Sequence, residues 1–306
     1  MSADEASTPP DDLDALLELA SAHDLELDGS TLRTEEIGLD FRVAIASASD
    51  GQHWVMRIPR RPEVLRRAAV ERELLRTIAP LLEVAVPDWR IVTPELIAYP
   101  LLPGTPGLAV SADGTVRWEV EMSSRRYAVS LGTAVAGVHA VDPGTAAASG
   151  IEVRSPAQVR EAWARDLRRV ADSFTIAPSL RARWEAWLAE DGLWPQHTVL
   201  THGELYPGHT LVEGEEISAI IDWTTAAIGD PAKDLMFHQV TAPPEVFDLA
   251  LETYVGEGGT AWPRLAEHCT EMYSAGAIGY GIYALETGEA AHREAAAAAL
   301  DPPDAD

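Results

Sequence analysis

The sequence predicts an α+β protein of two lobes, with a β-rich N-terminal lobe and a larger helical C-terminal lobe. Short β-prone runs at 41–46 and 54–58 flank Ser49-Asp50-Gly51, which is a hairpin turn signal. After Ser123, apolar residues recur mainly at helical spacing. The domains expected from this change are an acidic tail with a short helix at 1–24, an N-terminal lobe at 25–102 and a C-terminal lobe at 103–306.

Each expected element has its own local signal. Residues 1–10 are acidic and Pro-bearing and predict a disordered tail, and the leucines that follow predict a short amphipathic helix. A helix is expected over 62–76, and Thr93-Pro94 separates two short strands. Residues 101–107 are rich in Pro and Gly and predict a linker. The helices expected in the second lobe are 127–140, 155–170, 180–189, 245–254, 262–286 and 289–300.

Composition limits the possible partners. The chain has 49 Asp plus Glu against 23 Lys plus Arg, a formal net charge of −26. Such a surface repels phosphate backbones, so we expect neither nucleic-acid nor membrane-surface partners, whereas a cationic small molecule would be attracted. The single cysteine, Cys269, excludes an internal disulfide and a Cys-rich zinc site. No apolar run approaches the ~18 residues of a membrane span, and residues 1–14 lack a secretory pattern, which favours a cytoplasmic location.

One segment carries a set of residues with a catalytic spacing. Glu204 is a potential base, His209 follows five residues later, and Asp222 ends an apolar run. Protein kinases have the same skeleton, H-R-D-x-x-x-x-N followed by a Mg²⁺-holding Asp, because the base must reach the acceptor hydroxyl while the later residues bind metal at the phosphates. We therefore expect a protein-kinase-like fold, with Glu204 as catalytic residue and His209 and Asp222 as Mg²⁺ ligands. The alternative is a plain β-hairpin turning at 213–216.

A second set of residues falls where a kinase N-terminal lobe binds nucleotide. Arg57 ends Trp54-Val55-Met56-Arg57, in the place of the strand lysine of V-A-I-K, and keeps its positive charge. Glu71 suits best as its helix partner, with Glu73 as the alternative; a solvated strand end is the other explanation for Arg57. A phosphate-covering loop is a weak possibility at 38–41. The residues expected to contact the nucleotide at the hinge are Tyr99, Pro100 and Leu101.

Further residues are expected to support the loop or meet the acceptor. His202 is expected to hold the loop in shape, and Asp234 to brace it. Asp230 can cap the helix that follows or face a cationic acceptor. Apolar and aromatic side chains on the late helices are the expected acceptor pocket, although for any one of them plain helical core is the favoured explanation. These residues are Met236, Phe237, Met272, Tyr273, Ile278 and Tyr280.

Taken together, several strings resemble the macrolide 2′-phosphotransferases, a group of the aminoglycoside phosphotransferase-like kinases. The strings are those at 38–43, 54–61, 86–90, 93–101, 221–234 and 277–288. The likeness covers nearly the whole chain after about residue 25. It implies transfer of the γ-phosphate of GTP (ATP is possible) to the hydroxyl beside the dimethylamino group of a macrolide's amino sugar, which inactivates the antibiotic. These enzymes commonly have His at the Asn position, which supports His209 as a metal-side ligand, and a monomer is expected.

Glu204 departs from the family, which usually has Asp at this position. The longer side chain displaces the carboxylate unless the loop shifts, and such a displacement can cost on the order of 10²-fold in rate. Two alternatives therefore stay open. One is a kinase of the same fold that acts on an aminoglycoside or another small hydroxylated amine. The other is a non-catalytic binding protein.

Overall fold

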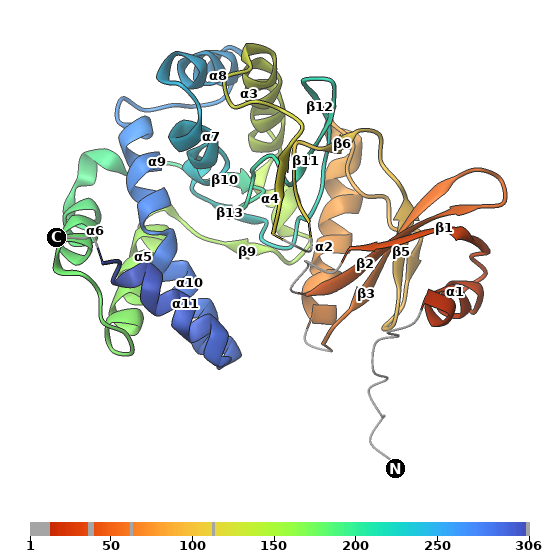
Figure 1. Ribbon diagram of the computed structural model, residues 1–306. Helices are drawn as coiled ribbons and strands as arrows, with labels where there is room; N and C mark the ends of the chain where they lie inside the picture. Colours follow the sequence, from red (N-terminus) through yellow and green to blue (C-terminus); the bar gives the residue numbers. More distant parts are fainter. Residues whose placement is uncertain (1–12, 36–39, 62–63, 112–113, 304–306) are drawn as a thin grey trace. The chain divides into compact units, whose positions relative to one another are not determined.

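The computed structural model describes residues 13–35, 40–61, 64–111 and 114–303 (Figure 1). The predicted tail at 1–10 and the glycine of the possible phosphate loop, Gly38, lie outside the described residues. The chain forms two compact units, and the predicted mixed α+β class is confirmed. The first unit is Met1–Glu121 with Ala148–Ile151 and Pro207–Thr224, and the second is Met122–Ala147, Glu152–Tyr206 and Thr225–Asp306.

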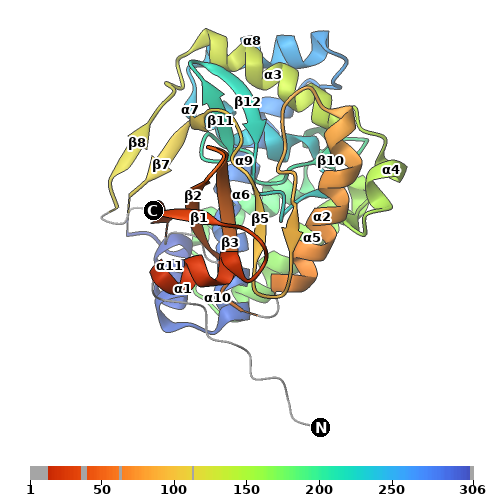
Figure 2. The ribbon, with the colours of Figure 1, turned by 90° about the vertical axis from the view of Figure 1, so that its right-hand side faces the viewer.

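The first unit is built on a five-stranded antiparallel sheet of order β1-β2-β3-β5-β4. Its strands are β1 (Leu27–Glu35), β2 (Phe41–Ala48), β3 (His53–Pro59), β4 (Ile91–Val92) and β5 (Ile97–Pro100). The predicted hairpin at β2–β3 is confirmed, and Gly51 adopts φ +84° in its turn, a left-handed conformation that glycine enters without strain. Figure 2 shows the sheet with α1 beside it.

Two helices accompany this sheet in the first unit. Helix α1 (Leu13–Ser21) buries Leu16 and Ala20 in a cluster with Met56 and Leu96 of the sheet. Helix α2 (Val64–Ile78), which is followed by a 3₁₀ turn, η1 (Ala79–Leu81), buries the apolar face predicted from its helical spacing. That face also carries a carboxylate, Glu71, which matters for the site below.

The rest of the first unit contains short strands far apart in sequence. These are β6 (Thr105–Pro106), β7 (Leu108–Val110), β8 (Val116–Trp118), β11 (Thr210–Glu213) and β12 (Glu216–Ile220). Strand β6 pairs with β11 to complete a three-stranded sheet of order β12-β11-β6, and β7 and β8 form a separate hairpin. The segment 101–107, predicted as a linker, therefore contributes a strand.

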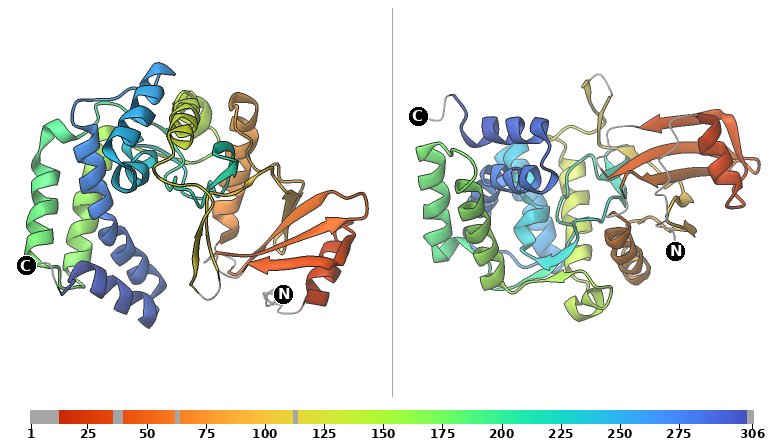
Figure 3. Two further views of the ribbon diagram at one scale, coloured as in Figure 1. Left: turned by 45° about the horizontal axis from the view of Figure 1, so that its top comes forward. Right: turned by 90° about the horizontal axis from the view of Figure 1, so that it is seen from below.

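The second unit is mainly helical, as predicted, with one small sheet of order β10-β13-β9. Helices α3 and α8 pack closely because Gly132 has no side chain: a Cβ there would lie 2.4 Å from the carbonyl oxygen of Ala250. Figure 3 gives two further views of this bundle. The elements are α3 (Arg125–His139), α4 (Pro143–Ala147), β9 (Glu152–Val153), α5 (Pro156–Ala171), α6 (Pro178–Ala189), η2 (Asp191–Leu193), β10 (Val199–Thr201), β13 (Ala227–Gly229), η3 (Pro231–Asp234), α7 (Met236–Thr241), α8 (Pro244–Gly256), α9 (Leu265–Ser274), α10 (Gly276–Thr287) and α11 (Ala290–Leu300).

The single helix predicted at 262–286 is wrong. It is two helices, α9 and α10, separated at Ala275. Gly276 and Gly279 lie directly after the break, and glycine weakens a helix by about 1 kcal/mol per residue relative to alanine, so the apolar periodicity continues although the helix does not. Within the described part of the chain, no helix combines the length and the apolar character that a membrane crossing requires.

Candidate active site

The loop that carries Glu204 begins at the end of β10 in the second unit. Gly203 has φ +89°, and a Cβ there would lie 2.4 Å from the carbonyl oxygen of Thr225, so only glycine fits. The carboxylate of Asp234 accepts hydrogen bonds from the backbone N–H groups of His202 and Gly203, both at 2.8 Å. Asp234 therefore braces the loop, as the sequence predicted.

The braced loop presents the side chain of Glu204 to solvent. His202 is fully buried, and its Nδ1 accepts a hydrogen bond from the backbone N–H of Glu204 at 3.4 Å. Its carbonyl oxygen accepts from Thr225 Oγ1 at 3.0 Å. His202 thus has the structural part predicted for it, whereas Glu204 is exposed.

In the first unit, the hairpin β11–β12 joins the two predicted metal ligands. His209 precedes β11 and Asp222 follows β12, so closing the hairpin leaves His209 Nε2 3.8 Å from Asp222 Oδ2. The turn lies at Gly214, between Glu213 and Glu216, where the alternative interpretation put it. The hairpin therefore explains why the two predicted metal ligands, thirteen positions apart in the sequence, lie close together.

Asp222 has an unusual backbone. Its φ of +62° is left-handed, a conformation that is uncommon outside glycine, is adopted more readily by Asn and Asp than by other residues, and costs of order 1–3 kcal/mol. Neighbouring groups hold it there: Thr224 Oγ1 donates to Asp222 Oδ1 at 2.6 Å, and the backbone N–H of Trp223 donates to Glu71 Oε1 at 3.3 Å. The Asp222 side chain remains 41% exposed. A partly exposed carboxylate on a strained backbone is typical of a functional position.

Arg57 is buried and paired with the predicted helix glutamate. Its Nη1 donates to Glu71 Oε1 at 3.0 Å, and its Nη2 lies 3.9 Å from Asp222 Oδ1. Arg57 is 6% exposed, so the solvated-end alternative is wrong, and Glu73 pairs instead with Arg76. Glu71 thereby contacts both the guanidinium and the backbone that follows Asp222.

Aromatic rings fix the plane of the Arg57 guanidinium. Its Cζ lies 4.0 Å from the centre of the Phe41 ring and 5.5 Å from that of Trp89. Burial opposes the positive charge, but the carboxylates of Glu71 and Asp222 more than offset it, and the pKa of Arg57 is raised. A planar cation suits this place better than the ammonium of lysine, because it stacks on rings while its edges pair with carboxylates.

We expect the Arg57→Met substitution to destabilise the protein by about 3–5 kcal/mol, because it leaves Glu71 as an uncompensated buried charge. The double variant Arg57→Met with Glu71→Leu removes both charges and is expected to recover most of that loss. Thermal unfolding of both variants checks this. Equal stability of the single and double variants would contradict the argument.

The three predicted hinge residues lie at the end of β5. Tyr99 pairs with Val55 of β3, two positions from Arg57, and is 7% exposed. Pro100 pairs with Trp54, and the backbone N–H of Leu101 donates to the carbonyl of His53 at 2.8 Å. Strand pairing with β3 therefore fixes the backbone of all three residues.

The predicted acceptor residues divide by exposure. Three of them are buried: Asp230 is 2% exposed, Met272 is 1% exposed and Ile278 is 0% exposed. The Asp230 carboxylate accepts from the backbone N–H of Ala232 at 3.0 Å and contacts His268 Nε2 at 2.8 Å, so it caps η3, which is one of its two predicted roles. These three residues therefore do not present a surface to a ligand, and Met272 and Ile278 belong to the buried core.

The other predicted acceptor residues are at least partly exposed: Met236, Phe237, Tyr273 and Tyr280. The Phe237 ring lies 5.6 Å from that of Tyr206 and 6.5 Å from that of Tyr273. The aromatic row of Tyr206, Phe237 and Tyr273 therefore begins two residues after Glu204. Tyr206 was not predicted as an acceptor contact, although its place beside Glu204 in the sequence was an available signal.

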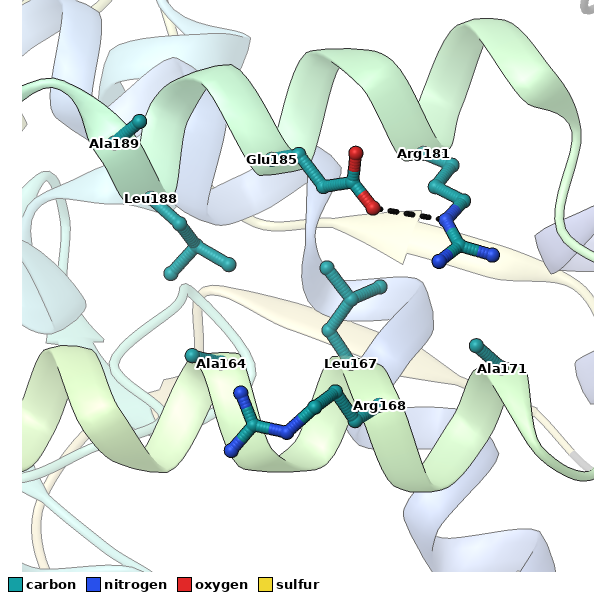
Figure 4. Close-up of a pocket in the computed structure, with 8 residues that line it drawn as sticks. All are labelled: Ala164, Leu167, Arg168, Ala171, Arg181, Glu185, Leu188 and Ala189. Atoms are coloured by element: carbon teal, nitrogen blue, oxygen red, sulfur yellow. Dashed lines mark hydrogen bonds and ion pairs between the residues drawn. The ribbon is translucent and has the colours of Figure 1, made fainter.

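Surface hollows elsewhere in the second unit do not involve these residues. One of about 450 Å³ lies between α5 and α6 (Figure 4). Small and apolar side chains line it, with the ion pair of Arg181 and Glu185 at 2.8 Å across one side. It contains none of the site residues predicted from the sequence, so it is not the predicted active site.

His238 beside the aromatic row makes stability depend on pH. It is 3% exposed, and among the described residues neither ring nitrogen has a hydrogen-bond partner. Burial lowers its pKa from 6.5 to about 4. The unfolded chain therefore binds this proton more readily than the folded protein does, and stability falls as the pH drops from 6.5 towards 4.

We expect the His238→Leu variant to lose less stability between pH 7 and pH 4.5 than the parent, by roughly 2–3 kcal/mol, because it cannot take up the proton. Urea unfolding at both pH values measures this. At pH 7 the variant should be nearly as stable as the parent, since leucine leaves no unpaired nitrogen. An unchanged pH dependence would assign the acid sensitivity to other groups.

Comparison with known proteins settles the family. Residues 31–268 match the phosphotransferase enzyme family. The chain belongs to this family. Among solved structures, the phosphotransferase resembles macrolide 2′-phosphotransferase MphH from Brachybacterium faecium, with 70% identity, a TM-score of 0.92, and coverage of 96% of this chain and 99% of that one. The resemblance predicted from the sequence is confirmed.

Two further relatives extend this comparison. Macrolide 2′-phosphotransferase type I is 38% identical, with a TM-score of 0.89 and coverage of 97% and 100% of the two chains. The uncharacterized protein YcbJ of Bacillus subtilis (strain 168) is 34% identical over 92% of this phosphotransferase and 94% of its own length. The GDP complex of aminoglycoside 2′-phosphotransferase-IIIa, at 16% identity and a TM-score of 0.75 over 94% and 95% of the chains, shares the fold, and the predicted kinase-like fold is confirmed.

Proposed function

We propose that this phosphotransferase transfers the γ-phosphate of GTP to the 2′-hydroxyl of the amino sugar of macrolide antibiotics and thereby inactivates them. The observation that carries the proposal is the 70% identity to MphH over 96% of the chain. The 38% identity to macrolide 2′-phosphotransferase type I over nearly the full length supports the same substrate class. ATP is the alternative donor.

Glu204 is the proposed base. The 2′-hydroxyl oxygen attacks the γ-phosphorus, the bond from that phosphorus to the bridging oxygen breaks, and GDP leaves. The proton of the hydroxyl passes to the carboxylate of Glu204. Support comes from its exposure on a loop whose backbone is held by Asp234 at 2.8 Å, because phosphoryl transfer depends mainly on positioning and electrostatics.

His209 and Asp222 are the proposed ligands of Mg²⁺, which when bound would neutralise charge on the phosphates. No group of three or more metal-ligating side chains occurs among the described residues. Asp222 nevertheless fits this ion, because Mg²⁺ at nucleotide sites is usually held by one or two carboxylates with phosphate oxygens and waters completing the shell. His209 would lie beside the ion, since its Nε2 is 3.8 Å from Asp222 Oδ2. The half-exposed, strained carboxylate of Asp222 suits such an open site.

Arg57 is proposed to hold donor phosphates, and Tyr99, Pro100 and Leu101 to contact the nucleotide along the edge of β5. The guanidinium is fully charged and pre-oriented by Phe41 and Glu71, so little side-chain freedom is lost when phosphate binds. The role of Glu71 is indirect: it would hold the Arg57 guanidinium and the backbone of Trp223 in place through its hydrogen bonds to both.

The aromatic row is proposed to bind the macrolide, with Met236 and Tyr280 extending its apolar area. A lactone ring needs such apolar surface, whereas a polycationic aminoglycoside needs closely spaced carboxylates. Asp230, Met272 and Ile278 are proposed to support these side chains from the interior. The net charge of −26 favours approach of the dimethylamino cation. A nucleoside triphosphate donor is consistent with action in the cytoplasm, and we propose a monomer without nucleic-acid or membrane partners.

A phosphate-transfer assay tests the proposal. The enzyme is incubated with GTP or ATP, each with an erythromycin-type macrolide, with kanamycin, or without acceptor, and phosphorylated product is measured by mass. We expect a macrolide product with GTP and a mass gain located on the amino sugar. Transfer to kanamycin alone would favour an aminoglycoside kinase, and nucleotide binding without any transfer would favour a binding protein.

A further inference from the structure

A buried hydrogen-bond relay reaches the catalytic loop from two helices of the second unit. Tyr254 of α8 contacts His139 Nδ1 through its hydroxyl at 2.9 Å, and His139 Nε2, from α3, contacts Asp234 Oδ2 at 3.2 Å. Asp234 is the carboxylate that holds the loop amides before Glu204. Tyr254, His139 and Asp234 are 0%, 8% and 2% exposed, so water does not compete for these contacts. We call these three residues the loop relay.

The chemistry of the partners assigns the protons along the relay. Burial alone would raise the pKa of Asp234, but the hydrogen bonds from His139 and the loop amides lower it, so Asp234 is a carboxylate. A carboxylate only accepts, and His139 Nε2 must therefore carry the hydrogen that faces it. Burial raises the pKa of Tyr254 to about 12, so its hydroxyl keeps its proton beside His139 Nδ1.

The anchor of the relay is rigid. The Tyr254 and His139 rings meet edge to face, with centroids 5.4 Å apart and planes at 86°. Their helices lie too close for any side chain at Gly132, where a Cβ would be 2.4 Å from the backbone of α8. Helices packed at backbone distance do not slide, because the interior is close-packed. The relay therefore holds the Asp234 carboxylate in a fixed position.

The other end of the 3₁₀ turn η3 is held in the same manner. Trp187 Nε1 donates to His268 Nδ1 at 3.0 Å, and His268 Nε2 contacts Asp230 Oδ2 at 2.8 Å. An aromatic donor, a histidine and an aspartate thus fix the start of η3 as Tyr254, His139 and Asp234 fix its end. With both ends held, Asp234 cannot follow a shifted loop.

We propose that His139 and Tyr254 are positioning residues for phosphoryl transfer, which act through Asp234 to hold the loop of Glu204 in its reactive place. This rests on the proposed function for its kinetic consequence. Without the relay, the Asp234 carboxylate loses the hydrogen bond from His139 that orients it. The backbone N–H groups of His202 and Gly203 then donate to a carboxylate that is no longer held in place. The displacement falls on the loop that carries Glu204 and not on the residues proposed to bind the donor, which belong to the first unit.

The test compares variants that remove one link each. His139→Leu removes the donor to Asp234, His139→Gln retains an N–H donor, and Tyr254→Phe removes a single hydroxyl. Ser274→Ala is the matched control, because the Ser274 hydroxyl likewise partners a buried ring nitrogen, Trp184 Nε1 at 3.1 Å, but in the packing of α6 against α9. Steady-state kcat and the KM values for GTP and an erythromycin-type macrolide are measured per folded enzyme, with Tm from thermal unfolding.

We expect His139→Leu to lower kcat on the order of 10²-fold and Tyr254→Phe on the order of 10-fold, with the KM for GTP changed less than about threefold. His139→Gln should regain much of the lost kcat. Ser274→Ala should lower Tm about as much as Tyr254→Phe and leave kcat unchanged. Parent-like kcat in His139→Leu, or an equal kcat loss in Ser274→Ala, would overturn the proposal.

Hydrogen exchange separates this proposal from the proposed function. The amides of His202 and Gly203 should exchange at least about tenfold faster in His139→Leu than in the parent, whereas Ser274→Ala should leave them protected. If the parent transfers no phosphate to any acceptor, the proposed function fails, and this measurement still tests the relay. Unchanged protection of both amides in His139→Leu would overturn the relay, whatever the activity.

Discussion

Replacing Asp222 by asparagine is expected to lower kcat by at least about 10³-fold while the protein stays folded. Loss of the ligand carboxylate leaves phosphate charge without its metal, and a metal supplies several kcal/mol of transition-state stabilisation, at about 1.4 kcal/mol per factor of ten. Asparagine is the informative choice because it tolerates the left-handed backbone found at φ +62°, so strain does not confuse the result. Turnover and Tm are measured together.

Asp88→Asn is the control for Asp222→Asn. It removes a carboxylate from the same unit, at a side chain that is 63% exposed and paired with Arg90 at the surface. Surface pairs contribute little, so kcat and Tm should both match the parent. If Asp222→Asn kept near-parent turnover over a range of Mg²⁺ concentrations, Asp222 would not be a metal ligand.

Glu204→Gln is expected to lose most of the rate, since a general base contributes typically ~10²–10⁴-fold. The glutamine keeps the size and polarity of the side chain but cannot accept the proton of the acceptor hydroxyl. Single-turnover rates with GTP and an erythromycin-type macrolide measure the loss, and the exposed turn variant Glu215→Gln serves as control. A Glu204→Gln enzyme as fast as the parent would remove Glu204 as the base.

The structure also gives a direction for Glu204→Asp, which restores the residue usual in related kinases. From the sequence alone, a relaxed loop could make this variant faster and a rebuilt loop could make it slower. Asp234 holds the loop at two amides, and Gly203 already lies against the carbonyl of Thr225, so the loop cannot advance to compensate for a shorter side chain. We expect kcat to fall on the order of 10–10²-fold. A faster Glu204→Asp enzyme would mean that the loop moves.

Two contacts among the predicted site residues could be anticipated from the sequence because each depends on a local pattern. The hairpin turn at Gly214 lies between His209 and Asp222, and a hairpin brings its own ends together. Likewise Glu71 rather than Glu73 shares the helix face of Leu75 and Ile78, so periodicity alone selected the partner of Arg57.

The rest depends on contacts between distant segments, for which one sequence has no signal. His139 meets Asp234 across 95 positions and Tyr254 across 115, and nothing near His139 distinguishes it from any buried histidine. Strand β6 is two residues long and exists only because β11 lies beside it. Periodicity showed that Met272 and Ile278 belong to apolar faces, but which faces are covered by other helices is a tertiary property.

The stacked guanidinium of Arg57 has a consequence for chemical probes. Reagents that label kinases by acylating the strand lysine need a neutral amine, and this position offers a guanidinium whose carboxylate neighbours keep it protonated. The sequence contains one lysine, Lys233, and it lies in η3 of the other unit. Nucleotide-mimicking electrophiles designed for lysine should therefore spare this enzyme while modifying lysine-bearing kinases in the same cell extract, and an inhibitor with lasting action would have to engage another nucleophile.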